Sequence, residues 1–528
     1  MVPIHLDMDV VMKELKQVTK EEQLETGEFK IQSEAVRRVP ESLSKKYNVV
    51  PLEVDQKTLI LASATPVQSD VFDDLTAAAG CPLEFIYVSN EVLLRARSLA
   101  YGHKDELEKI LESLEQGPLI DPTTATTVGE VEDIFSQGPV SRAIHIFIEQ
   151  AVRQGASDIH MEPQEDHYRI RYRVDGLLKE VKLLKKSLQP AMTSSTKIMA
   201  SLDIGEQRLP QDGRFQVDTM GRKIDLRVSS FPTLYGEKIV LRILDKEHGV
   251  VGIDKLGLAE HELLKIEKLI QRPHGIVLVT GPTGSGKSTT LYAVLKKVSN
   301  FTRNVVTLED PIEYNLPGVN QAQINPKKGL TFATGLRSIL RQDPDVIMVG
   351  EIRDRETAEI AIHASLTGHL VLSTLHTNDA PSAMTRLIDM GIEPFLAASS
   401  VEGVMAQRLL RRLCPSCKRQ FNPPKDLLDR LGVNSEVVKG PFFEADGCPE
   451  CAETGYRGRI AITELMLIDD QIREMIHRKA SATELRQAAI KAGMHTLRDD
   501  ALLKVQEGAT SIEELLRILS EVAAYEEP

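Results

Sequence analysis

The chain has no tryptophan, 4% aromatic residues and five cysteines in 528 residues. So few aromatic side chains leave few platforms on which the bases of a nucleic acid could stack. The formal net charge of -13 also argues against a nucleic-acid binder, because such a protein needs a basic surface to hold phosphates. We therefore expect no nucleic-acid partner, although the overall charge leaves room for a local basic patch.

Long apolar runs are missing as well. Short runs such as 276–279 and 346–349 have four residues, whereas a membrane-spanning helix needs about 18. The first 16 residues lack the basic region and the apolar region of a secretory signal. The sequence thus predicts a cytoplasmic protein that would reach a membrane only by docking from outside the bilayer.

The composition that is present divides the chain into six parts. Apolar stretches at 58–63 and 84–89 predict strands and 91–101 predicts a helix, so we expect a small α/β docking domain over 1–102. Residues 103–138 read as a charged helix and then a linker rich in Gly, Pro, Thr and acidic residues, which cannot bury a core.

The third part is predicted to be an α+β domain, PAS-like, over 139–250. Arginines alternate with apolar residues over 167–174, which is typical of a half-buried strand. Asp175 and Gly176 suit the tight turn of a hairpin that returns along the next residues. A second hairpin is predicted over 215–231.

The pattern then changes to continuous apolar runs at 275–280, 304–309, 345–351 and 369–376, which alternate with helical stretches. Continuous runs indicate strands that are buried on both faces. The sequence therefore predicts that 251–410 form a parallel sheet covered by helices.

The last part, residues 459–528, is predicted to be helical. Ser481 and Ser511 each stand three residues before a glutamate, which is the pattern of a capping box at a helix start. The apolar residues that follow Ser511 recur on one helical face, so we expect them to pack.

The residues 281-GPTGSGKST-289 match the phosphate-binding pattern G-x-x-x-x-G-K-[ST]. Its glycines let backbone N–H groups point at a β-phosphate, Lys287 adds a cation on the β/γ oxygens, and the Ser288 hydroxyl binds Mg²⁺. A predicted strand precedes the loop and a predicted helix follows it, as the motif requires. We expect ATP to be held by Gly281, Pro282, Thr283, Gly284, Ser285, Gly286, Lys287, Ser288 and Thr289.

Hydrolysis needs acidic and cationic groups beside such a loop. Glu351 ends the buried run 345–351, at the edge where ligands of open α/β sheets bind. A second acidic group, 309-EDPIEY-314, could bind magnesium or act as a general base. His376 ends the next run and is a candidate sensor of the γ-phosphate. The candidate cations for the developing negative charge are Arg214, Arg227, Arg337 and Arg341.

Four of the five cysteines form two C-x-x-C pairs that are separated by 30 residues, within the fifth part, 411–458. Two chelating pairs suit a tetrahedral Zn²⁺ site, with a redox pair as the alternative, and four thiolates leave no open position for catalysis. The predicted ligands are Cys414, Cys417, Cys448 and Cys451. Cys81 is expected to be unpaired and buried. Basic residues flank the first pair, so this segment could dock on an acidic protein, an anionic lipid surface or nucleic acid.

These motifs resemble a known family. The blocks 281–293, 308–314, 342–358 and 365–380 resemble the Walker A, Asp box, Walker B and His box of the ATPases of type II secretion and type IV pilus assembly. The signatures 155-GASDIH-160, 171-RYRVDG-176 and 210-PQDGR-214 resemble that family's second N-terminal domain. The resemblance covers residues 139–528 well and 35–100 more loosely, and it implies a RecA-like ATPase core.

The resemblance also implies roles for individual residues. Glu313 would activate water, with Glu309 and Asp310 beside it, and Glu351 would be the Walker B carboxylate. His376 would couple the nucleotide state to contacts between subunits. Arg214 and Arg227 would reach the nucleotide from the second domain.

The family resemblance further implies a homohexamer, in which each site is completed across domains and subunits. Domain rotation would be passed to an inner-membrane platform protein, and a membrane-anchored cytoplasmic adaptor would attach the ring peripherally to the inner membrane.

Within the family, the tetracysteine segment and the extra N-terminal domain favour assembly or secretion over pilus retraction. The single compact N-terminal domain favours type II secretion, with type IV pilus assembly as the alternative. Two other classes stay open: a nucleic-acid translocase and a nucleotide-switched binding module without turnover. The sequence has no N-K-x-D base reader, which counts against a GTPase switch.

Overall fold

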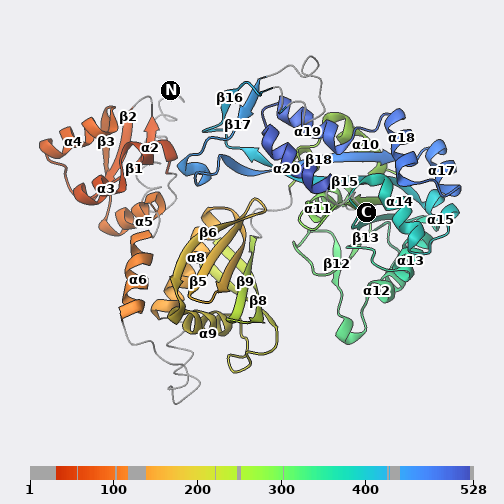
Figure 1. The fold of residues 1–528 in the computed structure, drawn as a ribbon, viewed down its shortest axis with the longest axis horizontal. Coiled ribbons are helices and arrows are strands. Elements are labelled where there is room, and N and C mark those ends of the chain that lie inside the picture. Colours follow the sequence, from red (N-terminus) through yellow and green to blue (C-terminus); the bar gives the residue numbers. More distant parts are fainter. Residues whose placement is uncertain are drawn as a thin grey trace, which may run out of the picture.

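The computed structural model describes residues 31–55, 58–101, 104–116, 138–219, 222–245, 251–300, 302–424, 427 and 441–523. Along these residues the chain forms three α/β units in succession, each built on its own sheet (Figure 1). The multidomain α/β architecture that the sequence predicts is confirmed. The predicted linker stretch 117–137 lies outside the described residues.

The N-terminal unit is a three-stranded sheet in the order β1-β2-β3, in which β1 and β2 are antiparallel and β2 and β3 are parallel. The strands are β1 (Val49–Asp55), β2 (Thr58–Ser63) and β3 (Leu83–Tyr87). The helices are α2 (Ser33–Arg38), α3 (Glu41–Tyr47), α4 (Ser69–Ala79) and α5 (Asn90–Tyr101), and the charged helix α6 (Lys104–Gln116) follows. The strands and helices predicted here are confirmed.

Cys81 is unpaired, as expected, but it is only partly buried, so the prediction of a buried thiol is wrong. It lies in the turn between α4 and β3, directly after Gly80, which ends α4 with a φ of 65°. That turn runs along the margin of the small core, where solvent still reaches the side chain.

The second unit is an antiparallel sheet in the order β6-β5-β4-β9-β8-β7. Its strands are β4 (Ala156–Pro163), β5 (His167–Val174), β6 (Leu177–Lys185), β7 (Gln211–Thr219), β8 (Arg222–Thr233) and β9 (Gly236–Asp245), with helices α8 (Pro139–Arg153) and α9 (Gln189–Met199) and the short η2 (Lys186–Leu188). Asp175 and Gly176 take φ values of 48° and 88° between β5 and β6, which confirms the predicted hairpin turn. The buried residue Tyr172 donates a hydrogen bond of 2.7 Å to the carbonyl of Phe147 on α8, so helix and sheet share one core.

The third unit is a seven-stranded sheet in the order β12-β11-β13-β14-β10-β15-β18. All neighbouring pairs are parallel except β15 with β18. The strands are β10 (Gly275–Thr280), β11 (Val305–Glu309), β12 (Asn320–Gln323), β13 (Val346–Val349), β14 (Leu370–Leu375), β15 (Val401–Leu413) and β18 (Tyr456–Leu467). The residues of β10, β11, β13 and β14 are buried throughout, which confirms the prediction of a covered parallel sheet.

Helices cover this sheet and complete the chain. They are α10 (Glu260–Ile270), α11 (Lys287–Val298), α12 (Phe332–Ile339), α13 (Arg355–Leu366), α14 (Ala380–Asp389), α15 (Pro394–Ser400), α17 (Asp470–His477), α18 (Ala482–Lys491), α19 (Leu497–Gln506) and α20 (Ile512–Ala523), with the short η3 (Ile253–Lys255) and η4 (Pro326–Lys328). Ser481 begins α18 with a complete capping box, as predicted.

Two expectations for the C-terminal residues need correction. The start of the stretch predicted to be helical is the strand β18, because its apolar run is buried against the antiparallel edge of β15. At Ser511 the hydroxyl accepts from the amide of Glu514 at 3.1 Å, as in a capping box. The Glu514 carboxylate, however, accepts hydrogen bonds from Arg411 and Arg517, so this box is only half formed.

The tetracysteine segment is inserted between two strands of the sheet. β15 leads directly into Cys414 and β18 begins five residues after Cys451, so the segment is an insert between two paired strands. It carries the short pair β16 (Arg419–Phe421) and β17 (Phe442–Glu444) and the turn η5 (Pro449–Cys451).

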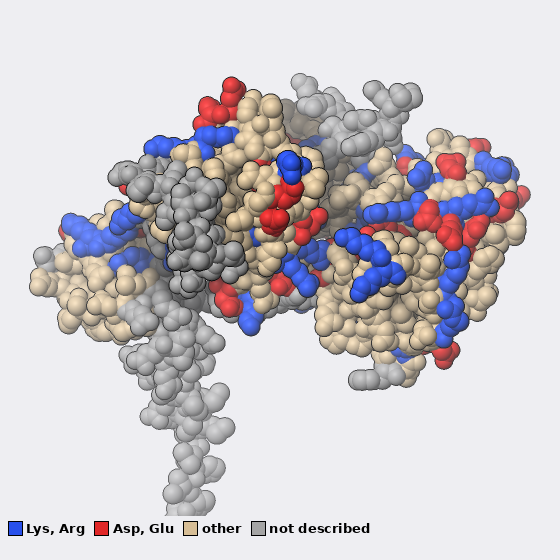
Figure 2. All heavy atoms as spheres, turned by 90° about the horizontal axis from the view of Figure 1, so that it is seen from below, with Lys and Arg blue, Asp and Glu red and all other residues tan. Residues whose placement is uncertain are grey.

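The surface drawn in Figure 2 carries Lys and Arg side chains interspersed with Asp and Glu. Among the helices that the structure describes, none combines the length and the apolar composition needed to cross a bilayer.

Candidate active site

The loop between β10 and α11 has a backbone that only glycine adopts easily. Gly281, Gly284 and Gly286 have φ values of 146°, 81° and 88°. A Cβ on Gly281 would lie 2.5 Å from the carbonyl oxygen of Gln407, and a Cβ on Gly286 would lie 2.7 Å from its Nε2. The turn therefore favours glycine at all three positions, and the close approach of β15 further requires it at Gly281 and Gly286.

Lys287 closes this loop on itself. Its Nζ donates hydrogen bonds to the carbonyls of Gly281 at 2.8 Å and Pro282 at 3.0 Å, and the residue is 9% exposed. Burial lowers the pKa of Lys287 to about 8, although the nearby Glu351 opposes the shift. Ser288 and Thr289 are exposed at the start of α11. The Lys287 cation is thus buried against the loop, and the hydroxyl-bearing residues Ser288 and Thr289 are open to a ligand.

Gln407, on β15, forms hydrogen bonds with this loop and with α11. The sequence did not predict this residue. It is 3% exposed; its Nε2 donates to the carbonyl of Ser285 at 2.9 Å and its Oε1 accepts from the hydroxyl of Thr290 at 2.7 Å. One side chain therefore connects the loop, the first turn of α11 and the neighbouring strand. The sequence carries no clear signal for this role, because Gln407 is followed directly by Arg408 and β15 holds other polar residues.

Glu351 and His376 lie together at the carboxyl ends of β13 and β14, as their positions in the sequence predict. The Nε2 of His376 is 3.4 Å from Oε2 of Glu351, and the Nη2 of Arg353 is 2.6 Å from Oε1. Burial and the charge of Lys287 lower the pKa of His376, which keeps the imidazole neutral at pH 7. Arg353 was not predicted, because an arginine after a strand has no spacing that marks it.

Glu309 ends β11 and is buried at 3% exposure. Its carboxylate accepts hydrogen bonds from Tyr292, from Thr307 at 2.5 Å and from Gln321 at 3.1 Å. The hydroxyl of Tyr292 in turn accepts from the amide of Glu313 at 3.1 Å. This geometry makes Glu309 a support for the backbone of the acidic loop. Asp310, by contrast, is exposed.

Arg227, on β8 of the second domain, reaches the same acidic loop. Its Nη2 donates to the carbonyl of Ile312 at 3.2 Å, and its Nη1 is 3.7 Å from Oε2 of Glu313. Both side chains are about one-third exposed, so a ligand can still approach them. The structure thus brings together a carboxylate and a cation that are 86 positions apart in the sequence.

The other predicted arginines are not joined to this site. Arg214 is the cross-strand neighbour of Arg227, but it is exposed and forms no hydrogen bond or ion pair with any residue that the structure describes. Arg337 pairs with Glu356 at 2.5 Å, and Arg341 donates to the carbonyl of Arg337.

The four predicted metal ligands converge in the insert. Their sulfur atoms all lie within 4.8 Å of one another, with separations of 3.8 Å between Cys414 and Cys448, 3.8 Å between Cys417 and Cys451 and 3.7 Å between Cys448 and Cys451. Four Zn–S bonds of about 2.3 Å at tetrahedral angles would place the sulfurs ~3.8 Å apart. The cluster therefore could bind zinc, whereas a disulfide would need two sulfurs at bonding distance.

The surroundings of the cluster shift the pKa values of its thiols in different directions. Although burial opposes it, amide donors from Cys448 at 3.2 Å and Gly455 at 3.1 Å lower the pKa of Cys451 to about 7. Burial raises the pKa of Cys417 to about 12 and also raises that of Cys448. The mutual approach of all four sulfurs agrees with a metal site better than with a redox pair.

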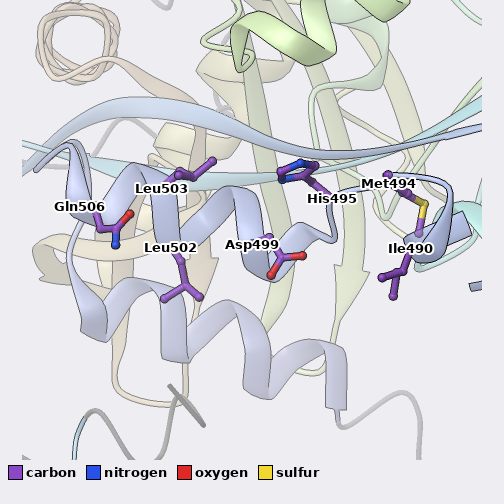
Figure 3. A pocket seen from close by; sticks show the side chains of 8 residues that line it. Ile490, Met494, His495, Asp499, Leu502, Leu503 and Gln506 are labelled. Atoms are coloured by element: carbon purple, nitrogen blue, oxygen red, sulfur yellow. The ribbon is translucent and has the colours of Figure 1, made fainter. Parts of the chain in front are cut away.

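A groove of about 380 Å³ lies away from these residues, between the end of α18 and α19 (Figure 3). Its lining includes Ile490, Met494, His495, Leu502 and Leu503. None of the residues predicted to bind nucleotide or metal lines it, so it takes no part in the site.

Comparison with known proteins agrees with this geometry. Residues 133–517 match the family described as type II/IV secretion system protein, and residues 21–107 match the MshEN domain. The chain belongs to the type II/IV secretion system protein family. It is accordingly a secretion ATPase, an enzyme that hydrolyses ATP, and the predicted enzyme class is confirmed.

Relatives of this secretion ATPase match it nearly end to end. A type II secretion system protein E from Pseudomonas aeruginosa is 46% identical over 92% of this chain and 97% of its own length. The type IV pilus assembly ATPase PilB from Myxococcus xanthus is 44% identical over 93% of this chain and 87% of its own length.

Comparison with a solved structure supports the fold of the secretion ATPase, but carries no argument about its function. The ATPase DotB from Legionella pneumophila is 23% identical, with a TM-score of 0.53 over 72% of this chain and 95% of its own length.

The low pKa of Lys287 predicts how nucleotide binding depends on pH. Phosphates bind the protonated lysine, so the complex holds one proton more than the free protein above pH 8, and affinity falls as pH rises. We expect equilibrium titration with a fluorescent ATP analogue and Mg²⁺ to show a constant affinity below pH 7 and a loss of about tenfold by pH 9. Lys287→Arg, whose cation stays protonated, should lose no affinity over this range relative to its own value at pH 7. An equal loss of affinity in the wild type and in Lys287→Arg would show that deprotonation of Lys287 does not cause the pH dependence.

The buried contacts of Gln407 predict a binding defect. Gln407→Ala leaves the Ser285 carbonyl and the Thr290 hydroxyl without this partner, which costs about 1–3 kcal/mol and should raise the dissociation constant for nucleotide by roughly tenfold. The matched control is Gln420→Ala, because Gln420 is exposed on the adjoining β16. Nucleotide binding by Gln407→Ala that equals the wild type would show that the loop does not need this support.

Proposed function

We propose that this ATPase drives type II protein secretion. The observation that carries the proposal is the 46% identity to a type II secretion system protein E over 97% of that relative's length, N-terminal domain included. A second type II secretion protein from the same organism, HxcR, is 52% identical over 74% of this chain. Proteins of this family act within multi-protein machines, and we propose a homohexamer that is attached to the inner membrane through a platform protein and a membrane-anchored adaptor.

We propose that the triphosphate lies over the loop from Gly281 to Thr289. The amides of the loop and the N-terminus of α11 would face the phosphates, and Lys287 would exchange its two carbonyl partners for phosphate oxygens. Mg²⁺, when bound, neutralises charge on the β and γ oxygens; the exposed Ser288 hydroxyl and Glu351 are the groups that would hold it.

Glu313 is proposed to accept the proton of the attacking water. Its backbone is fixed through Tyr292 and Glu309, while its carboxylate stays about one-third exposed, and these contacts support a positioned base. Arg227 lies beside it and would stabilise negative charge on the γ-phosphoryl oxygens. Neutral His376, in contact with Glu351, would report the state of the γ-phosphate to the start of α14.

The exposed Arg214 supports the proposed ring. Its side chain is exposed next to Arg227 and unpaired among the described residues, so it is available to a nucleotide bound by a neighbouring copy. The zinc proposed for the four cysteines would be structural, since four thiolates fill its coordination sphere.

Type IV pilus assembly is the second candidate. It is favoured by the PilB relative, which is 44% identical over 93% of this chain. The type II relatives have somewhat higher identities, so secretion is preferred.

The proposed base is tested by Glu313→Gln. The amide is nearly isosteric but cannot take up a proton, so steady-state ATPase assays should show a loss of at least about 100-fold, with ATP binding retained. Glu359→Gln removes an exposed pair with Arg355 and serves as the control, because such pairs contribute little. Turnover by Glu313→Gln within a few-fold of the wild type would mean that another group activates the water.

The choice of machine is tested in the organism from which the gene comes. Replacing Lys287 with alanine in the chromosome should stop the release of secreted enzymes into the medium and leave surface pili in normal number. Loss of pili with secretion intact would instead assign the protein to pilus assembly. Both phenotypes are scored in the same strain, with the wild-type gene restored as the control.

A further inference from the structure

One residue at the tip of the β5–β6 hairpin in the second domain is shielded from solvent, although hairpin tips are usually exposed. Asp175 stands in the turn, yet its side chain is only 15% exposed. Its Oδ2 accepts a hydrogen bond of 2.9 Å from the amide of Gly458, and its Oδ1 is 3.7 Å from Nε of Arg459. The cover is thus the beginning of β18, directly after the tetracysteine turn.

A second contact joins the same hairpin to the cysteine turn itself. Lys179, on β6, donates a hydrogen bond of 2.6 Å to the carbonyl of Ala452. Ala452 follows the ligand Cys451 and has a φ of 50°, and the next residue, Glu453, has a φ of 63°. Two successive left-handed residues that are not glycine are costly, so their conformation needs support from the surrounding turn.

That support comes from the cysteine turn. The amide of Glu453 donates to the carbonyl of Cys448 at 2.9 Å, and the amide of Gly455 donates to the sulfur of Cys451 at 3.1 Å. The amide of Cys414 donates to the carbonyl of Gly455 at 2.9 Å. The turn that carries the Ala452 carbonyl, which receives Lys179, is therefore hydrogen-bonded to three of the four cysteines.

The second domain contacts the ATPase unit at two places. One is the β5–β6 hairpin on the cysteine turn, and the other is Arg227 on the acidic loop. Arg227 is in the same sheet as β5 and β6, and it contacts Ile312 and Glu313. The β16–β17 pair lies beyond one end of β15 and β18, above the upper ends of β5 and β6 in Figure 1. A rigid sheet that is fixed at its hairpin tip presents Arg227 from a defined position.

We propose that the tetracysteine turn is a docking surface for the β5–β6 hairpin, so that metal loading of the cysteines positions the second domain and its Arg227. Asp175 and Lys179 are positioning residues in this scheme, not catalytic ones. The inference about turnover rests on the proposed role of Arg227, whereas the docking itself does not.

The docking is tested in the full chain by amide hydrogen exchange and metal analysis. Asp175→Ala should raise exchange several-fold in peptides covering 172–180 and 455–460, while zinc content stays at one ion per chain. Removing zinc from the wild type with a chelator should raise exchange at 172–180 to the same level, and should add nothing there in Asp175→Ala. The control is Asp218→Ala, an exposed aspartate on β7 of the same sheet, which should change neither peptide.

The outcomes separate the docking from the catalytic proposal. Hairpin exchange that stays at the wild-type level after zinc is removed would overturn the docking. If exchange rises in Asp175→Ala but kcat is unchanged, the link from the hairpin to Arg227 is overturned. A fall in kcat of several-fold with unchanged affinity for ATP supports the whole inference, because the lysine and the loop that bind phosphate are untouched.

Discussion

The loop between β10 and α11 is the proposed phosphate site, and the other proposed catalytic residues lie around it. Three glycines in left-handed or strained conformations let the amides turn inward, and no other residue fits at two of them because Gln407 packs so closely. Lys287 donates to the carbonyls of its own loop and its pKa is lowered by burial. The loop is thus preorganised for negative charge that it does not itself supply.

The parallel sheet explains why the chemical groups meet at this loop. β13 and β14 are neighbours in the sheet, and β14 is next to β10, so residues that follow these strands reach one edge. Glu351 and His376 therefore come within 3.4 Å of each other although they are 25 positions apart. The second domain contributes the Arg227 guanidinium, which faces Glu313.

The sequence predicted the fold class, the buried strands of the ATPase sheet, the β5–β6 hairpin and the convergence of four cysteines. Those features depend on local patterns: continuous apolar runs, an Asp-Gly turn and the spacing of the cysteines in C-x-x-C pairs. The prediction of a helix at β18 was wrong because residues 461–466 are all buried, so the strand lacks the alternation of polar and apolar residues that marks a half-exposed strand. Gln407 was missed because its partners, Ser285 and Thr290, are more than 100 positions away in the chain. Arg353 was missed because no spacing marks an arginine that follows a strand. The burial of Glu309 is not evident from an acidic cluster in the sequence. The docking of the hairpin on the cysteine turn joins residues more than 270 positions apart, which no local pattern predicts.

The most direct measurement of the central claim is amide hydrogen exchange of the peptide that covers residues 281–289, with and without ATP and Mg²⁺. We expect strong protection of these amides on binding, because they would donate to phosphate oxygens, and no comparable change around α19 and the groove beside it. If ATP binds with full stoichiometry and the amides of 281–289 exchange as fast as before, the nucleotide lies elsewhere and this loop is not the phosphate site.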